Sequence, residues 1–381
     1  MRVGWSKKTM NEIATITMGQ SPSGNSINEI DGIEFHQGKI YFGEKYINES
    51  HFYTSEPIRI AEPNSLLLCV RAPIGVVNMT DRKICIGRGL CSIKANDSIH
   101  PNYLYYALLS QKDYFDKNAT GSTFLAISSN VVKDTQISFP SKDKQIQIAS
   151  ELDMITEMIS KYDEQLKELD KLSQSIFYEM FGDPVENEKG WEVKKLEEIC
   201  DVRDGTHDSP KYVLQSEYVL ITSKNIINGS IDFNNVNYIS EEDYNSINKR
   251  SKVDDGDIIM PMIGTIGNPV IVHTDNVYKF CIKNVALIKF IKGTRILNSY
   301  LLSLLKTTSF SDYIISLNKG GTQKFVALGT IRNLPIILPP LPLQQSFARK
   351  IEAIEAMKSK VKEAKKEAET LLAARMQYWF E

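Results

Sequence analysis

The sequence lacks the features of a membrane protein and of a disulfide-stabilised secreted protein. Its apolar runs are short or interrupted by proline, and none approaches the ~20 residues that cross a bilayer. The five cysteines form no CxxC pair, and the opening residues MRVGWSKKTM lack the apolar core and small-residue cleavage site of a signal peptide. We therefore expect a cytoplasmic protein with reduced thiols and no membrane span.

Signatures of catalysis are also missing. No GxxxxGK[ST] phosphate loop, HExxH sequence or Cys/His cluster with metal-ligand spacing occurs, and the five histidines are scattered. The glycines of Gly87 to Gly89 and Gly264 to Gly267 form segments too short for a dinucleotide site and are better explained as turns. We expect no catalytic residue, no metal and no cofactor. A binding or scaffold protein is favoured, and an enzyme with an unrecognised site is the disfavoured alternative.

The charge balance excludes a generally basic, DNA-coating surface. The chain has 45 Lys and Arg against 47 Asp and Glu, a formal net charge of -2, so any nucleic-acid site must be a local patch. Two short segments have opposite sign. Residues 141–181 contain five basic and nine acidic side chains, and residues 341–381 contain eight basic and six acidic ones.

The chain of 381 residues contains a long internal repeat. GSTFLAI, beginning at Gly121, aligns with GGTQKFV, beginning at Gly320, and the same offset superposes Gln145 on Gln344 without a gap. Upstream the offset becomes smaller, as loop insertions in the second copy would produce. The matched pairs there are Tyr103 with Tyr300, Ile74 with Ile266, Gly19 with Gly205, and Trp5 with Trp191.

The repeat predicts two globular parts, each followed by a long helix. We expect a first domain over residues 1–140, a central helix over 141–182, a second domain over 183–340 and a C-terminal helix over 341–381. Short β-branched runs predict strands, and each copy contains one segment typical of a short helix. The fold class is therefore α+β, with the sheet topology left open. The strand segments are Ser65 to Val70, Lys83 to Ile86, Asp257 to Met260, Pro269 to Val272 and Val285 to Phe290, and the helical ones are Tyr103 to Leu109 and Tyr300 to Leu305.

Both long helices show a 3.5-residue apolar period, which is typical of a coiled-coil seam. In the second helix Lys358 and Lys365 interrupt the period, with Met357, Ala364 and Leu371 available on the adjoining stripe. The opposite charges favour pairing between the helices, while the alternative is that each covers only its own domain. The seam positions are Ile148, Leu152, Ile155, Ile159, Tyr162, Leu166, Leu169, Ile176 and Met180, then Phe347, Ile351, Ile354, Val361, Ala368 and Leu372.

This arrangement resembles the specificity subunit of type I restriction-modification systems over essentially the whole chain. The resemblance depends on an ordered set of residues that occurs twice. It comprises Trp5 and Trp191, Gly19 and Gly205, the GxT segments with Thr123 and Thr322, the strands Ile137 to Pro140 and Ile336 to Pro339, and the glutamines Gln145 and Gln344.

The resemblance implies a subunit without its own chemistry. Each globular part would be a target recognition domain that reads one half of a bipartite, asymmetric target in double-stranded DNA. The helices would form an antiparallel coiled coil that docks methyltransferase (modification) subunits, with a restriction subunit joining through the complex. Antiparallel pairing of equivalent helices also creates a pseudo-twofold axis, which suits duplex DNA. The alternatives are a repeat scaffold that binds only protein, which the near-zero charge favours, or a specificity module of another multi-subunit restriction-modification class.

Candidate DNA contacts are basic or flat polar side chains in the globular parts, especially beside glycine. Any one of them can equally be a solvated surface side chain. The first copy offers Gln37, Lys39, Arg71, Arg88, Ser122 and Thr123, and the second offers Thr222, Lys224, Asn225, Lys283, Asn284, Lys319, Thr322, Gln323 and Lys324.

Overall fold

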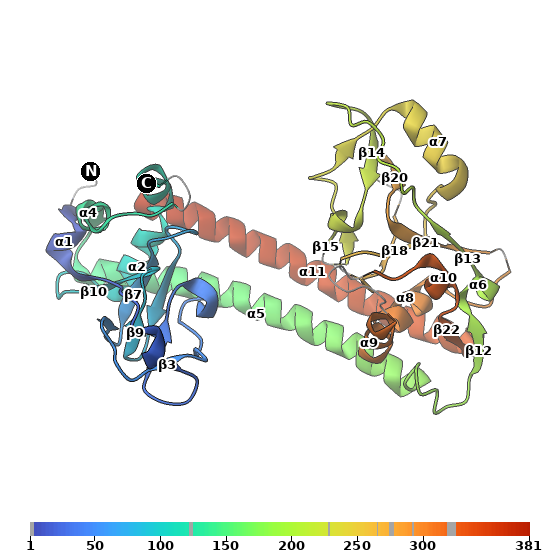
Figure 1. Cartoon of the computed structure of the whole chain (residues 1–381), viewed down its shortest axis with the longest axis horizontal. Helices are drawn as coiled ribbons and strands as arrows, with labels where there is room; N and C mark the ends of the chain where they lie inside the picture. The colour runs from blue at the N-terminus through green and yellow to red at the C-terminus, as the bar shows by residue number, and fades with distance from the viewer. Residues whose placement is uncertain are drawn as a thin grey trace. The chain divides into compact units, whose positions relative to one another are not determined.

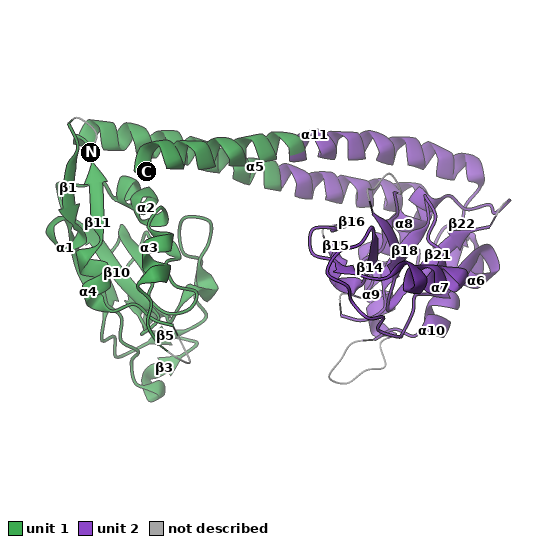
Figure 2. Ribbon diagram, turned by 90° about the horizontal axis from the view of Figure 1, so that it is seen from above, with its two compact units in different colours: residues 1–163, 363–381 green, residues 164–362 purple. Residues whose placement is uncertain are grey.

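The computed structural model describes residues 4–121, 125–227, 229–264, 266–273, 278–291, 293–317 and 325–381. The chain forms two compact units, unit 1 with residues 1–163 and 363–381 and unit 2 with residues 164–362 (Figure 2). The long helices α5 (Lys142–Phe181) and α11 (Leu341–Phe380) each contribute to both units. Each unit is therefore one globular part together with a portion of both long helices.

The globular part of unit 1 contains two sheets and a strand pair (Figure 1). One sheet has the order β2-β10-β7-β8, the other has the order β3-β5-β4-β9-β6, and β1 pairs with β11. Within the second sheet β4 and β9 are parallel. The elements are β1 (Ser6–Thr9), α1 (Met10–Ile13), β2 (Ala14–Met18), η1 (Gly24–Ser26), β3 (Ile27–Asn28), β4 (Ile33–His36), η2 (Lys39–Tyr41), β5 (Tyr53–Thr54), β6 (Ile60–Ala61), β7 (Ser65–Cys69), β8 (Val77–Thr80), β9 (Ile84–Ile86), β10 (Leu90–Ala95), α2 (Pro101–Leu109), α3 (Lys112–Lys117), α4 (Ser129–Asp134) and β11 (Gln136–Phe139).

Strand β7 lies between two hydrophobic clusters of unit 1. All five of its residues are buried because both faces of the strand are covered. Leu66 and Leu68 face the core beneath α2, whereas Leu67 and Cys69 face a second cluster with Ile84 of β9. The sequence therefore shows a continuous apolar run where a half-exposed strand would alternate.

Unit 2 repeats this architecture. Its sheet β13-β21-β18-β19 corresponds strand by strand to β2-β10-β7-β8, β12 pairs with β22, and β14 pairs in parallel with β20. The predicted duplication is confirmed. The elements are β12 (Glu192–Lys195), α6 (Leu196–Ile199), β13 (Cys200–Asp204), β14 (Tyr218–Ile221), η3 (Ser223–Asn225), β15 (Ile226–Ile227), β16 (Ser230–Ile231), β17 (Asn237–Tyr238), α7 (Glu241–Ser251), β18 (Ile258–Pro261), β19 (Val270–Ile271), β20 (Lys279–Ile282), β21 (Val285–Phe290), α8 (Asn298–Lys306), α9 (Thr308–Ser316), α10 (Leu328–Arg332) and β22 (Pro335–Leu338).

Each globular part contains more short helices than the one that the sequence predicts. The predicted segments do form α2 and α8, but α3 and α4 accompany α2, and α9 and α10 accompany α8. Most of the additional helices have six residues or fewer, and so few residues cannot display a helical period. The longer α7 is strongly polar, with Ser240 accepting a hydrogen bond from the Asp243 amide at its N-terminus.

The two long helices run antiparallel within each unit. In unit 1, Arg375 of α11 pairs with Glu151 of α5, and Lys365 Nζ lies 2.6 Å from Asp163 Oδ1. In unit 2, Lys358 Nζ lies 2.6 Å from Asp170 Oδ1. Partner numbers on α11 decrease as those on α5 increase, which defines antiparallel pairing and confirms the predicted coiled coil.

The seam differs from the prediction at its polar positions. Lys358 and Lys365 stay in the seam, and their long side chains reach carboxylates on α5. The adjoining stripe does not replace them, because Met357 and Leu371 are 53% and 48% exposed.

The end of α5 differs as well. Ile176 and Met180 are only half-buried, whereas Phe177 and Phe181 are fully buried against Tyr300 of α8 and Phe347 of α11. Because this end of α5 packs on the core of the globular part, its buried positions are each one residue later than a regular heptad predicts.

All five cysteines are buried thiols without a disulfide. Burial raises the pKa of Cys69, Cys91, Cys200 and Cys281 to about 12. Within the described part of the chain, no helix is long and apolar enough to cross a membrane.

Candidate nucleic-acid interface

Each unit has a corner where the chain passes from one sheet to the other. In unit 1 the corner is Gly87 to Gly89, between β9 and β10, and in unit 2 it is Lys283 and Asn284, between β20 and β21. The end of the neighbouring strand is bound to each corner by the same backbone hydrogen bond. Gly19 N donates to Leu90 O over 2.9 Å, and Gly205 N donates to Val285 O over 3.0 Å.

This close approach explains why the repeat retains glycine at both positions. A Cβ built on Gly19 would lie 2.1 Å from Gly87 O, and one on Gly205 would lie 2.3 Å from Ile282 O. Both neighbours are backbone carbonyls, which cannot move aside without breaking the corner. Glycine at these positions therefore follows from local geometry and needs no ligand to explain it.

We expect Gly205→Ala to loosen the corner of unit 2 and to lower the free energy of unfolding by about 1–3 kcal/mol, typical of overpacking. Urea denaturation gives the free energy, and amide hydrogen exchange at β20 and β21 shows whether the loosening is local. Gly329→Ala is the matched control, because a Cβ there meets nothing within 4 Å. Equal effects of the two substitutions would contradict the steric explanation.

Four of the sequence-based candidates of unit 1 come together at its corner. Gly89 N donates to Gln37 O over 3.1 Å, and Val70 N donates to Gly89 O over 2.9 Å. These bonds place Gln37 and Lys39 (after β4), Arg88 (in the corner) and Arg71 (after β7) on adjoining loops. All four side chains are exposed.

The basic side chains at this corner are available for an external anion. Lys39, Arg71 and Arg88 form no ion pair with any residue that the structure describes. Gln37 Oε1 accepts a 3.3 Å hydrogen bond from Ser21 Oγ, which holds its amide at the surface. Ser122 and Thr123 lie outside the described residues.

Unit 2 has a corner of the same construction with different side chains. Lys283 Nζ donates to Ser209 Oγ, and Asn284 Oδ1 lies 3.1 Å from His207 Nδ1. Lys283 N donates to Ile221 O, which brings the loop of Thr222 and Lys224 to the corner. The candidates Lys319, Thr322, Gln323 and Lys324 lie outside the described residues.

Asn225 has a structural role. It is 6% exposed, its Oδ1 accepts from the Thr222 amide over 3.0 Å, and its Nδ2 donates to Asn235 O over 2.9 Å. Both ends of the amide are therefore occupied inside the fold. We leave Asn225 out of the interface.

Sequence reasoning missed Ser21, His207 and Ser209 at these corners. His207 Nε2 lies 2.8 Å from Asp204 Oδ2, and Arg250 also pairs with Asp204. The Asp204 carboxylate therefore fixes the orientation of the His207 ring. Their position in the chain was the available signal, because these residues lie two to four residues after Gly19 or Gly205.

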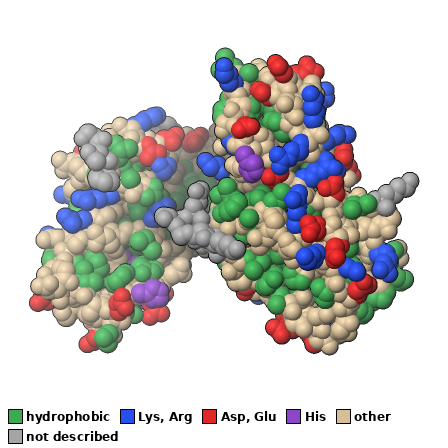
Figure 3. Space-filling model, turned by 45° about the vertical axis from the view of Figure 1, so that its right-hand side comes forward, with side chains coloured by type: hydrophobic (Ala, Val, Ile, Leu, Met, Phe, Trp, Pro, Cys, Tyr) green, Lys and Arg blue, Asp and Glu red, His purple; other side chains and the backbone are tan. Residues whose placement is uncertain are grey.

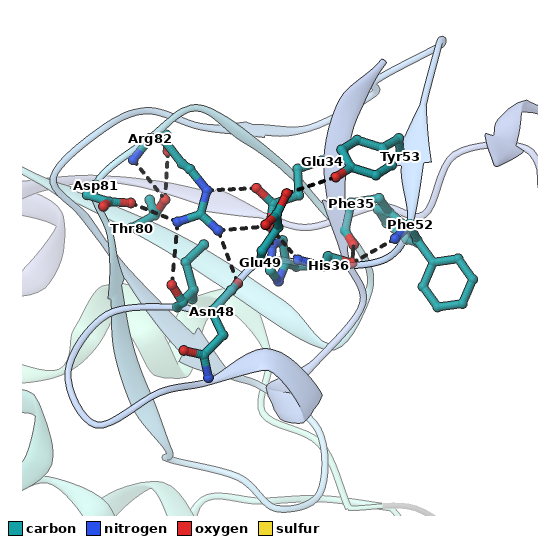
Figure 4. Close-up of polar contacts among 12 residues, drawn as sticks. Glu34, Phe35, His36, Asn48, Glu49, Phe52, Tyr53, Thr80, Asp81 and Arg82 are labelled. Carbon is teal, nitrogen blue, oxygen red and sulfur yellow. Dashed lines mark hydrogen bonds and ion pairs between the residues drawn. The ribbon is translucent and has the colours of Figure 1, made fainter. Parts of the chain in front are cut away.

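A buried ionic network supports the loop that carries Gln37 (Figure 4). Arg82 binds Glu34 of β4 with two hydrogen bonds, Nε to Oε2 over 2.7 Å and Nη2 to Oε1 over 2.8 Å. Arg82 Nη2 also donates to Asn48 O, and the Ser50 amide donates to Glu34 Oε1. Burial opposes ionisation of Glu34, but these hydrogen bonds outweigh it and lower the pKa of the carboxyl group.

His36 completes this network at the last residue of β4. Its ring is fully buried and lies 2.8 Å from Glu34 Oε1. Burial lowers the pKa of His36, and the neighbouring Glu34 offsets only part of that effect. A neutral ring and a doubly bound carboxylate therefore fix the strand that leads into the Gln37 loop.

The distribution of surface charge agrees with the expectation that any nucleic-acid site is a local basic patch. On the face drawn in Figure 3, Lys and Arg side chains form small separate clusters with Asp and Glu side chains between them. Within the described ranges, no group of three or more His, Cys, Asp or Glu side chains is placed to hold a metal ion.

The sequence matches a family model described as the type I restriction modification DNA specificity domain, over residues 2–170 and 188–370. A putative type I restriction enzyme MjaX specificity subunit of Methanocaldococcus jannaschii is 34% identical over 163 residues, which is 42% of this chain and 38% of that protein. The MjaIX specificity subunit of the same organism is 26% identical over 378 residues, covering 90% of this chain and 85% of the relative.

The fold agrees with this match. The S subunit of a type I restriction-modification system from M. genitalium superposes with a TM-score of 0.57 at 16% identity, over 98% of this chain and 95% of that structure. Since the two regions matched by the family model cover most of both repeats, the chain belongs to the type I restriction-modification specificity subunits.

Proposed function

We propose that the chain is the DNA-reading subunit of a type I complex, without catalysis of its own, and that each unit reads one half of a bipartite, asymmetric target. The observation that supports this most directly is the repeated corner. The same backbone hydrogen bonds at Gly19 and Gly205 present different side chains in the two units. A constant frame with variable loops is suited to reading two different half-sites.

The side chains at the two corners suit different DNA contacts. Arg88 and Arg71 can bind guanine or phosphate with two hydrogen bonds, and the amide of Gln37 can bind adenine in the same manner. In unit 2, the Asn284 amide is the candidate for base reading, while Lys224 and Lys283 can neutralise phosphates. The two half-sites should therefore differ in sequence.

The long helices are the proposed docking surface for methyltransferase subunits, through which a restriction subunit would join. Large apolar side chains remain exposed on them in both units. Met154 is 60% exposed and Met158 43% on α5 in unit 1, and Met357 is 53% exposed on α11 in unit 2. Exposed methionines on a helix face suit a partner helix, because their flexible side chains adapt to the opposing surface.

The decisive experiment measures half-site recognition in the assembled complex. The target is first identified by sequencing the sites methylated by the chain with its methyltransferase subunits. Binding is then measured on duplexes mutated in one half-site at a time. We expect Arg88→Ala and Asn284→Ala each to reduce discrimination in one half-site only, by about 1–3 kcal/mol per base contacted.

Lys117→Ala serves as the surface-charge control, since Lys117 lies at the end of α3 and not in the corner. It should leave discrimination in both half-sites unchanged. If Arg88→Ala reduced discrimination equally in both half-sites, the assignment of one half-site per unit would be wrong.

A further inference from the structure

Unit 2 contains a groove of about 1150 Å³ between its globular part and the long helices. Its walls include the β15–β16 turn, helix α8 and segments of α5 and α11. The residues that matter here are Gly229, Leu302, Ser303, Lys306 and Glu352.

The equivalent place in unit 1 is filled by the chain itself. Lys45, at the tip of the Phe42 to Ile47 hairpin, extends its ammonium to 2.5 Å from Asp153 Oδ1 on α5. The Tyr105 and Tyr106 rings of α2 lie beside it, with centroids 5.4 and 5.5 Å from Lys45 Nζ, and Tyr106 OH donates to Asp153 Oδ1 over 2.6 Å. This ion pair and two aromatic rings attach the hairpin to the long helix.

Backbone hydrogen bonds make the hairpins of the two units equivalent. Phe42 pairs with Ile47 in unit 1, and Ile226 pairs with Ile231 in unit 2. One residue outside each of these pairs, a 2.7 Å backbone hydrogen bond joins the two arms of the hairpin. It runs from Asn48 N to Tyr41 O in unit 1 and from Asp232 N to Asn225 O in unit 2. Counting along the two hairpins places Gly229 at the position of Lys45.

The helices are aligned in the same way. The hydroxyl of Tyr103 donates to Ser138 O, and that of Tyr300 donates to Ile337 O, which aligns Tyr105 and Tyr106 with Leu302 and Ser303. The buried glutamines Gln145 and Gln344 make equivalent hydrogen bonds at the starts of α5 and α11, which aligns Asp153 with Glu352.

Unit 2 therefore lacks the lysine and both tyrosine rings but retains the carboxylate. Glu352 is exposed to the groove and forms no ion pair with any described residue. Neighbouring carboxylates differ, because Asp170 and Glu355 are both bound by Lys358. Lys306 also lines the groove, with its ammonium beside Gly229, and the charges of Glu355 and Asp170 as well as those of Lys358 and Lys362 act on it.

We propose that this groove receives a lysine side chain of a methyltransferase subunit and that Glu352 is its carboxylate partner. Unit 1 supplies the template, since Lys45 binds Asp153 in the same place within one chain. The proposal rests on the proposed function and deepens it. The exposed Met357, on the same helix as Glu352, belongs to the surface that we assign to that subunit. The two units would then differ in docking. In unit 1 the carboxylate on the long helix binds a lysine of the same chain, and in unit 2 it binds a lysine of the partner.

The first test titrates the full-length chain with the purified methyltransferase subunit. We expect Glu352→Gln, and separately Ser303→Tyr, to weaken binding at least tenfold, the first by removing the charge and the second by filling the groove as Tyr106 does. Glu367→Gln is the control, because Glu367 is an exposed carboxylate of the same helix that does not line the groove. Thermal melting verifies that each variant is folded.

If both groove variants bound within twofold of the unsubstituted chain, the groove proposal would be wrong and methyltransferase docking would stand. If the unsubstituted chain itself did not bind, the proposed function would fail as well. If Lys306→Ala weakened binding of duplex DNA and no groove variant affected methyltransferase binding, the groove would be a phosphate site and the proposal would be overturned.

The second test identifies the partner's side chain directly. Because all five native cysteines are buried, Ser303→Cys provides a single accessible thiol for a short cysteine-to-amine crosslinker. We expect a crosslink to a methyltransferase lysine that disappears in the Glu352→Gln background. Met357→Cys is the positive control for proximity. A crosslink from Cys at position 357 and none from position 303 would refute the proposal.

Discussion

Arg82→Ala is expected to lower the free energy of unfolding of unit 1 by about 3–5 kcal/mol, because it leaves the buried Glu34 carboxylate without its charged partner. Glu34 is 9% exposed and accepts two hydrogen bonds from the guanidinium. Arg82 also binds Asn48 O, so the same substitution releases the loop beyond β4. Denaturant unfolding with hydrogen exchange at β4 and β9 measures both effects.

Two comparisons separate an unpaired charge from simple loss of packing. Arg59→Ala removes an exposed arginine of the same unit and should change stability by less than about 0.5 kcal/mol. The double variant Glu34→Gln/Arg82→Met removes both charges and should recover a large part of the loss. If the double variant were as unstable as Arg82→Ala, burial of an unpaired carboxylate would not be the cause.

The parts of this fold that could be predicted from sequence are those in which a residue is required by the backbone geometry around it. Gly19 and Gly205 permit a close backbone approach, and Gln145 and Gln344 bind local carbonyls at the start of a helix. Such residues recur in the same order in both copies because the same backbone geometry recurs. The duplication follows from this signal. The two long helices follow instead from their 3.5-residue apolar period, and their antiparallel pairing is what the family resemblance implies.

The parts that could not be predicted depend on contacts between distant segments. Nothing in the spacing of Glu34 and Arg82 reveals that they meet, since the pair forms only when β4 lies parallel to β9. The same applies to the corners. Gln37 and Arg88 were recognisable as residue types, but the backbone bonds that join their loops appear only in the fold. Burial of Asn225 was likewise invisible, because an asparagine after a strand reads as a surface residue.

The burial of Phe177 and Phe181 has the same origin. A heptad pattern assigns Ile176 and Met180 to the seam, because it considers only contact between the two helices. In the structure the last turns of α5 also pack on the globular part, where Tyr300 stacks on Phe177 with ring centroids 5.7 Å apart. A helix that contacts two partners buries a wider stripe than a coiled coil requires.

Phe347 joins these partners, and Phe347→Ala is therefore expected to lower the free energy of unfolding of unit 2 by about 3–5 kcal/mol. The ring is fully buried, with centroids 5.6 Å from Phe177 and 5.2 Å from Phe181. Its removal leaves a cavity in the aromatic cluster that connects α5, α8 and α11. We therefore expect faster hydrogen exchange in all three helices within unit 2.

Phe347→Leu keeps most of the buried volume and should restore a large part of the stability, while Met357→Ala, on the exposed side of the same helix, should cost less than about 0.5 kcal/mol. The alternative, that each helix covers its own domain independently, predicts a different distribution. In that case Phe347→Ala would speed exchange in α11 and leave α5 protected. Joint loss of protection in α5 and α11 would instead show that the aromatic cluster holds the helix pair to the globular part.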